Sequence, residues 1–179
     1  KNGNKTRFEY DALGRMIMLT DAMNNTEEYT YDSRGNLVGK KDKNGNATAF
    51  TYDYAGRVVK RINALGGMKV YTYDTLGNLV SETDENGNTT GYSYDTLGRI
   101  VGETDAYGNT TRFSYNHLGK MIEKTDALGN VVQNEYDEGA RLLRKIDALG
   151  NSKTFEYDNN SNLTAKYDEL GRVTTYSYD

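Results

Sequence analysis

The sequence lacks cysteine, proline and tryptophan, and it has a single histidine, His117. Without cysteine there is no disulfide, so the cysteine count leaves the redox compartment open between the cytosol and the cell exterior. Only 36% of the 179 residues are apolar, and 16 residues of that class are tyrosines. The aliphatic residues of an ordinary core are therefore scarce. No apolar run approaches the roughly 18 residues of a membrane-spanning helix.

The charges are balanced and mixed along the chain. The formal net charge is -4, and acidic and basic residues alternate without a basic stripe. Nucleic-acid binding depends on clustered lysine and arginine that neutralise phosphates. We therefore expect no nucleic-acid partner and no membrane span. The 19 glycines suit a chain that makes many tight turns.

A tyrosine recurs every 21 residues along the whole sequence, and aspartate follows it in eight of nine places, with Asn116 as the exception. Such a fixed period indicates stacked repeats. The sequence predicts one array over residues 1–179, about 8.5 units, and we expect it to be an excerpt from a longer array. The repeat tyrosines are Tyr10, Tyr31, Tyr52, Tyr73, Tyr94, Tyr115, Tyr136, Tyr157 and Tyr178.

Each unit contains two turns of the form D-x-x-G-[RN], as in Asp95–Arg99 and Asp126–Asn130. The aspartate side chain can accept a hydrogen bond from the backbone two residues on, and glycine in the fourth place adopts the left-handed conformation that closes a type I turn with a bulge. This pattern predicts hairpins. The turn glycines are Gly14, Gly35, Gly45, Gly56, Gly66, Gly77, Gly87, Gly98, Gly108, Gly119, Gly129, Gly150 and Gly171.

Three turns carry another residue in the glycine place: Asn24, Ala140 and Ser161. Asparagine tolerates positive φ, so Asn24 fits the turn. We expect Gly139 to shift the bend next to Ala140 by one residue. We expect the loop that contains Ser161 to be looser than the others.

Short strands are predicted between the turns. After the first turn comes an aliphatic pair such as Leu37-Val38, and before the next Tyr-Asp turn comes an aromatic-x-Tyr run such as Tyr71-Thr72-Tyr73. The two aromatics of a run share one face of the strand. One unit buries too little to fold alone, so aromatics are expected to meet those of the next unit in an antiparallel meander of about 17 strands. Asn134 leaves a gap in the aromatic column and marks the weakest unit.

The Tyr-Asp turn, the aliphatic pair and the second turn together resemble the YD or RHS repeat family. The similarity is seen in Asp53-Tyr54-Ala55-Gly56-Arg57-Val58-Val59 and in Asp147-Ala148-Leu149-Gly150-Asn151, and it covers the whole chain. The family includes bacterial Rhs and wall-associated polymorphic toxins, cocoon proteins of toxin complexes, and the teneurins. The resemblance implies an all-β array of antiparallel hairpins in a twisted, spiralling strip, part of a hollow shell or tube, in a secreted or cell-surface protein.

In toxins of this family the shell encloses a cytotoxic C-terminal segment, so the resemblance implies an enclosed toxin segment as a partner in a parent protein. This chain has too few units to seal a large shell. It also has no recognisable toxin domain and no proline-containing self-cleavage segment. Its expected partners are neighbouring repeats of the same or other chains, including end-to-end pairing through unpaired strand edges.

Catalysis and metal binding find little support in the residues. His117 occupies a variable turn position and is interpreted as a solvent-exposed residue. Asp42–Asn46 and Asp84–Asn88 begin like calcium loops but lack the glycine and glutamate that such loops need later on. We expect no enzyme activity, no metal and no cofactor.

Two functions of different classes remain from the sequence. One is a structural scaffold, as the wall of an RHS-type shell or as an extracellular stalk or filament. The other is an adhesin module that binds a glycan or a partner protein, with the tyrosine columns as a stacking platform for sugars. Because the exposed charged position Lys40, Arg61 and Glu82 changes sign between units, it indicates a solvated face and favours the scaffold.

Overall fold

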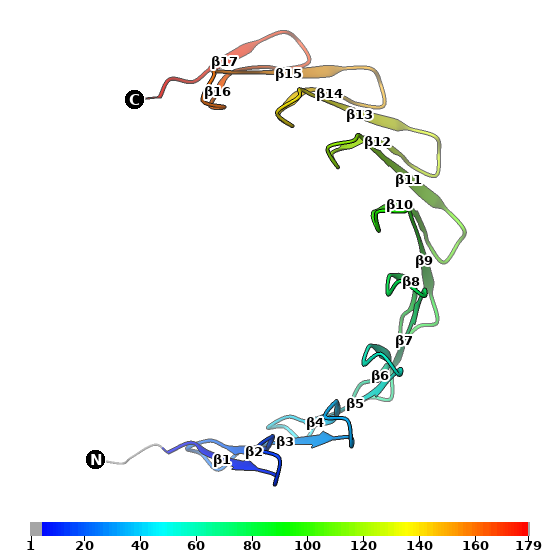
Figure 1. Ribbon diagram of the computed structural model, residues 1–179, viewed down its shortest axis with the longest axis vertical. Coiled ribbons are helices and arrows are strands. Elements are labelled where there is room, and N and C mark those ends of the chain that lie inside the picture. Colours follow the sequence, from blue (N-terminus) through cyan, green and yellow to red (C-terminus); the bar gives the residue numbers. More distant parts are fainter. Residues whose placement is uncertain (1–4, 179) are drawn as a thin grey trace. The chain divides into compact units, whose positions relative to one another are not determined.

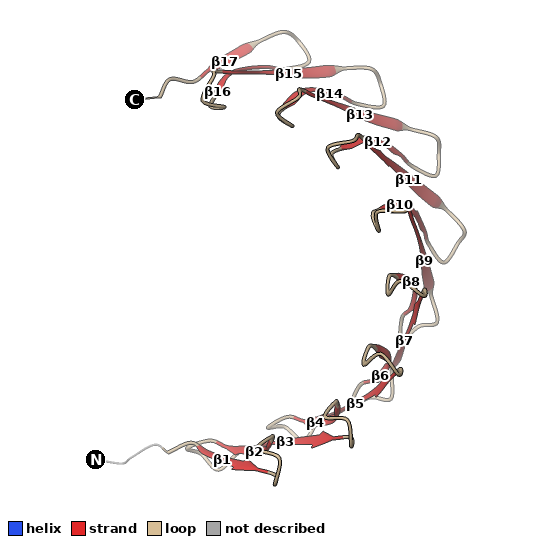
Figure 2. Cartoon of the chain, in the orientation of Figure 1, coloured by secondary structure: helices blue, strands red, loops and turns tan. Residues whose placement is uncertain are grey.

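The computed structural model describes residues 5–178, and these residues form β-strands and turns without any helix (Figure 2). The prediction of an all-β chain is confirmed, as is the expected strand number, because seventeen strands are present. They are β1 (Arg7–Tyr10), β2 (Met16–Thr20), β3 (Thr26–Tyr31), β4 (Leu37–Lys41), β5 (Ala47–Tyr52), β6 (Val58–Ile62), β7 (Met68–Tyr73), β8 (Leu79–Thr83), β9 (Thr89–Tyr94), β10 (Ile100–Thr104), β11 (Thr110–Tyr115), β12 (Met121–Thr125), β13 (Val131–Tyr136), β14 (Leu142–Ile146), β15 (Ser152–Tyr157), β16 (Leu163–Tyr167) and β17 (Val173–Thr175).

The chain divides into two compact units, Lys1–Thr90 and Gly91–Asp179, and the boundary falls within β9. A single continuous array over residues 1–179 stays a prediction. In unit 1 each strand from β1 to β8 pairs antiparallel with the next (Figure 1). In unit 2 the same holds from the Gly91–Tyr94 part of β9 to β17.

The register repeats from hairpin to hairpin. In the β5–β6 hairpin Phe50 faces Arg61 and Tyr52 faces Val58, with a bulge between Thr51 and Tyr52. The equivalent bulge precedes Tyr115 in the β11–β12 hairpin. Such a bulge adds local twist and lets a tight turn close the hairpin.

The turns follow the geometry that the sequence pattern predicts. In the turn at Asp53 the backbone N–H of Gly56 donates to the Asp53 carbonyl at 3.2 Å, and the Asp53 N–H donates to the Arg57 carbonyl at 3.0 Å. The thirteen glycines named above have φ between 75° and 96°. Asn24 has a φ of 63° in the same place. This is the left-handed region, where a residue without Cβ is least strained.

Two expectations about unusual turns are wrong. Ala140 has a φ of 63° and its N–H donates to the Asp137 carbonyl at 3.0 Å, so Gly139 does not shift the bend. Ser161 has a φ of 68° and its N–H donates to the Asp158 carbonyl at 3.0 Å, so its loop is as tight as the rest. The hydrogen-bonded turn overrides the steric preference of the residue.

The strands form a single layer with little interior. Among residues 5–178 only Gly102 and Ala165 are buried, and both lie in strands. The repeat aromatics are half-buried in most strands, while the Thr or Ser between them is exposed, as in Tyr71-Thr72-Tyr73. The shared face of the aromatics is therefore confirmed. Direct ring-to-ring packing between units stays a prediction.

Candidate functional site

The aspartate that opens each turn organises a local hydrogen-bond network. Oδ1 of Asp53 accepts the backbone N–H groups of Ala55 at 2.9 Å and Arg57 at 3.0 Å, and Oδ2 accepts Nε of Arg57 at 2.7 Å. The backbone N–H of Arg57 and then its side chain hold the pKa of Asp53 below its ordinary value. Both oxygens of this carboxylate are thus occupied in forming the turn.

The calcium-like loops use their carboxylates in the same way. Oδ1 of Asp42 accepts the N–H groups of Asn44 and Asn46, each at 2.9 Å, and Oδ2 accepts the Asn46 side-chain amide at 2.9 Å. Asp84 repeats this arrangement. Within residues 5–178 no three His, Cys, Asp or Glu side chains gather as a metal site would require. No helix in this part of the chain could cross a membrane.

Six repeat tyrosines tie together the two segments that flank the second turn of their own repeat. The hydroxyl of Tyr115 donates to the carbonyl of Ile100 at 2.8 Å, across the hairpin that separates the two residues. The same bond, at 2.8–3.0 Å, joins five further pairs: Tyr31 to Met16, Tyr52 to Leu37, Tyr73 to Val58, Tyr157 to Leu142 and Tyr178 to Leu163. The period of tyrosine is therefore also the period of a hydrogen bond that closes each of these six repeats. Tyr10 is 58% exposed.

The unit with Asn134 departs from this pattern. Here the side-chain amide of Asn134 donates to the Met121 carbonyl at 3.1 Å, which is the carbonyl that Tyr136 would take by analogy. Asn134 also replaces the aromatic residue that the other units place in this column. The gap predicted from the sequence is thus a real change in local bonding.

An arginine bridge links successive Tyr-Asp turns in alternate units. Nη1 of Arg57 donates to the carbonyl of Asp74 at 3.3 Å, and its guanidinium lies 4.6 Å from the ring centre of Tyr73. Its remaining nitrogens bind Asp53 in its own turn. We call this arrangement a closed junction. The four closed junctions are Arg15 with Tyr31 and Asp32, Arg57 with Tyr73 and Asp74, Arg99 with Tyr115 and Asn116, and Arg141 with Tyr157 and Asp158.

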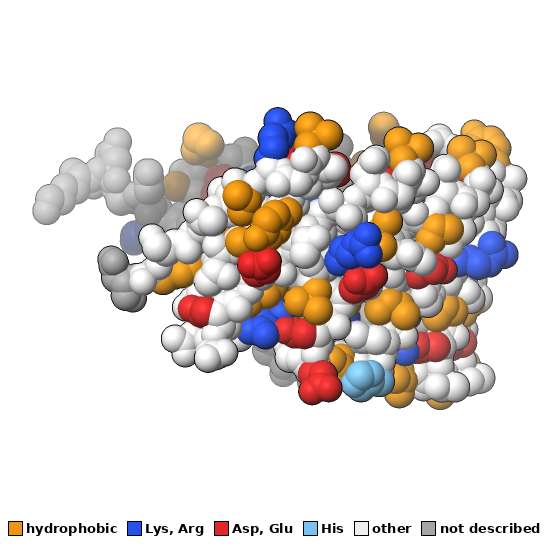
Figure 3. Space-filling view, turned by 90° about the horizontal axis from the view of Figure 1, so that it is seen from above, with side chains coloured by type: hydrophobic (Ala, Val, Ile, Leu, Met, Phe, Trp, Pro, Cys, Tyr) orange, Lys and Arg blue, Asp and Glu red, His pale blue; other side chains and the backbone are white. Residues whose placement is uncertain are grey.

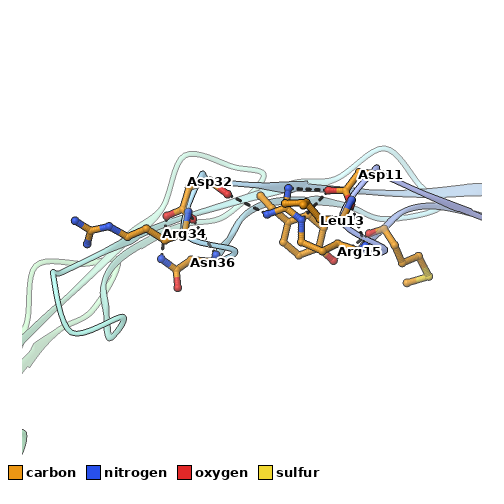
Figure 4. A network of polar contacts seen from close by, with 8 residues as sticks. Asp11, Leu13, Arg15, Asp32, Arg34 and Asn36 are labelled. Carbon is orange, nitrogen blue, oxygen red and sulfur yellow. Dashed lines mark hydrogen bonds and ion pairs between the residues drawn. The ribbon is translucent and has the colours of Figure 1, made fainter.

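The position that supplies the arginine alternates along the sequence. It reads Arg15, Asn36, Arg57, Asn78, Arg99, Lys120, Arg141 and Asn162. Figure 4 shows both kinds of residue: Arg15 extends to the carbonyl of Asp32, whereas Asn36 turns back onto the Asp32 carboxylate. Sequence reasoning treated arginine and asparagine as equivalent turn residues and missed the bridge. The signal was the alternation itself.

Two junctions without arginine have surface hollows, and we call these two open junctions. The one between the turns at Asn116 and Asp137 has a volume of about 550 Å³, and Tyr136, His117 and Glu138 are among its lining residues. The one between the turns at Asp32 and Asp53 has about 370 Å³. His117 is exposed, as expected from its variable position.

The face shown in Figure 3 mixes acidic, basic and apolar side chains without a field of one sign. The model of the Teneurin YD-shell matches residues 1–138. This chain belongs to the Teneurin YD-shell family. No curated protein matches the YD-shell chain in sequence.

Solved structures show the same fold. The Photorhabdus luminescens Tc holotoxin pore is similar with a TM-score of 0.73 and 18% identity over 95% of this chain. The crystal structure of TcdB2-TccC3 gives a TM-score of 0.74, also with 18% identity over 95% of the chain. The YD-shell chain spans only 11% and 12% of those proteins.

Proposed function

We propose that this YD-shell chain is a non-catalytic segment of wall in a larger shell of a secreted or cell-surface protein. The observation that carries the proposal is the lack of a second layer, with only Gly102 and Ala165 buried among the described residues. The chain exposes 12387 Å². A compact protein of 20.1 kDa exposes roughly 8,700 Å² by the usual scaling. Such a single layer suits a barrier between two spaces better than a site with an enclosed pocket.

The polar groups of the repeat support the same function. Turn carboxylates bind their own turn, tyrosine hydroxyls bind the preceding strand of the same repeat, and arginines bind the following repeat. The first two kinds of bond hold each repeat together and the third fixes one repeat to the next, which is what a continuous wall needs. Membership of the YD-shell family and the likeness to Tc toxin chains agree with a shell. Its contents would be another segment of the parent protein.

The turn tips supply an edge for lateral contact. Leu128, Leu149 and Leu170 lie at equivalent turn positions of consecutive repeats and are 88%, 87% and 77% exposed. Two strands separate each from the next, so they repeat about every 10 Å along the edge. A row of exposed leucines is costly in water and marks a contact surface. We assign it to the adjacent coil of a longer YD strip.

Sedimentation velocity of the purified chain tests this assignment. We expect concentration-dependent self-association that weakens at least tenfold when Leu128, Leu149 and Leu170 are all changed to serine. The matched control changes two exposed strand positions away from the turn tips, Ser114→Ala and Glu135→Gln, and should leave association unchanged. A chain that stays monomeric at millimolar concentration, or a selective glycan ligand on a glycan array, would contradict the wall and favour the adhesin module.

A further inference from the structure

The closed junctions show what the protein itself places between two Tyr-Asp turns. In unit 2, Arg99 lies 4.7 Å from the ring centre of Tyr115 and donates to the Asn116 carbonyl at 3.3 Å. In unit 1, Arg15 does the same with Tyr31 at 4.9 Å and Asp32 at 3.0 Å. Each junction therefore offers a ring face and a turn carbonyl to one guanidinium, whose other nitrogens bind the aspartate of its own turn.

The open junction between Asn116 and Asp137 retains the ring and the turn carbonyl without an arginine, and Asn116 stands in the place of the aspartate. Asn116, Tyr136 and Asp137 all line its hollow, in the places that Asp95, Tyr115 and Asn116 occupy in the closed junction before it. The chain supplies Lys120 where arginine would stand. Lys120 is exposed, and neither an ion pair nor a ring contact of its ammonium occurs among the described residues.

One lining residue of this hollow breaks the aromatic column. Asn134, one of the lining residues, stands in the column where Phe113 and Phe155 place rings in the flanking units. Its amide binds the Met121 carbonyl instead of covering the site. The hollow has a volume of about 550 Å³, against about 370 Å³ for the open junction between Asp32 and Asp53, where Phe50 and Arg34 are among the lining residues.

The charge of the lining is negative. The hollow is lined by four acidic side chains, those of Glu123, Glu135, Asp137 and Glu138. His117 is the only lining residue with a basic side chain. Arg141 offsets Asp137 at 2.6 Å, and Arg144 approaches Glu135 at 3.8 Å. Glu138 and Glu123 have no ion pair within residues 5–178, although Glu123 accepts the Gln133 amide at 3.1 Å. Carboxylates around the half-buried Tyr136 ring attract a cation and repel a phosphate.

We propose that the open junction between Asn116 and Asp137 binds the side chain of an arginine from a partner polypeptide. The guanidinium lies over the Tyr136 ring, donates to the Asp137 carbonyl and faces Glu138. Arginine suits this site better than lysine because a planar guanidinium can stack on the ring and donate to the carbonyl at once. The second hollow repeats the same three positions with Asp32, Tyr52 and Asp53. The site does not depend on the proposed wall function.

Titration of the whole chain with N-acetyl-arginine amide, followed by NMR of the Tyr136 ring and the Asn134 amide, tests the proposal. We expect saturable shifts at both groups. N-acetyl-citrulline amide has the same shape without the charge and should bind at least tenfold more weakly. N-acetyl-lysine amide should also bind more weakly. Equal shifts with the citrulline probe, or no shift at Tyr136 with the arginine probe, would overturn the site.

A substitution within the chain gives an independent control. Lys120→Arg should close the junction from inside, raise thermal stability and weaken probe binding at least tenfold. Lys120→Gln should leave binding within twofold, and Lys166→Arg controls for an added guanidinium elsewhere in unit 2. If Lys120→Arg bound the probe as well as the unchanged chain, the guanidinium would not occupy this junction.

Discussion

Changing Tyr115 to phenylalanine removes one hydroxyl from the chain and leaves the ring in place. That hydroxyl donates to the Ile100 carbonyl at 2.8 Å and links strands β10 and β11 of one repeat. A typical intramolecular hydrogen bond contributes about 1 kcal/mol to the free energy of unfolding. For a protein of this size, that loss corresponds to a fall of about 2–4 °C in Tm.

Tyr136→Phe is the matched control, because Tyr136 holds the equivalent position in the next repeat. The carbonyl that its hydroxyl would reach is already bound by Asn134, so this substitution should lower the free energy of unfolding by no more than about 0.5 kcal/mol. Urea denaturation of both variants, followed by circular dichroism, measures the difference directly. Equal losses for the two variants would refute the stabilising role of the tyrosine hydroxyl.

Three further predictions concern the turns. Gly129 has a φ of 84°, so Gly129→Val should lower the free energy of unfolding by about 1–3 kcal/mol. The control Leu128→Val should lower it by about 0.5 kcal/mol. Equal midpoints of urea denaturation for the two variants would contradict the strain in the turn. The Asn130 amide and backbone hold the pKa of Asp126 below its ordinary 3.8, so stability should be constant above about pH 4 and fall as pH drops through the lowered pKa in an acid titration. A chelator should leave Tm within about 2 °C, since the turn carboxylates bind their own backbone. A larger drop in Tm would favour calcium binding by the loops that start at Asp42 and Asp84.

The hairpins could be predicted from the sequence because their chemistry is local. Tyrosine and glycine recur at fixed spacing, and the aspartate that starts each turn lies within four residues of its hydrogen-bond partners. A local pattern of this kind is visible without knowledge of the fold. The same locality explains the errors at Ala140 and Ser161, because intact turn hydrogen bonds hold both residues at positive φ despite their side chains.

The junctions could not be predicted because they depend on contacts between units. Arg57 reaches a carbonyl 17 residues further on, and only the strand register places the two turns side by side. The sequence shows that arginine and asparagine alternate. It does not show where the next turn lies, so it does not reveal that only the arginine side chain is long enough to contact that turn. The hollow at Asn134 is likewise lined by residues of two successive Tyr-Asp turns, so it is visible only when both turns are placed.

Deleting one repeat, Asp74 to Tyr94, tests the central claim most directly. A wall built from equivalent units needs continuity and no particular unit, so amide hydrogen exchange should show the remaining strands protected to within about tenfold of the intact chain, with one hairpin fewer. Loss of protection throughout the chain would contradict an array of locally bonded repeats.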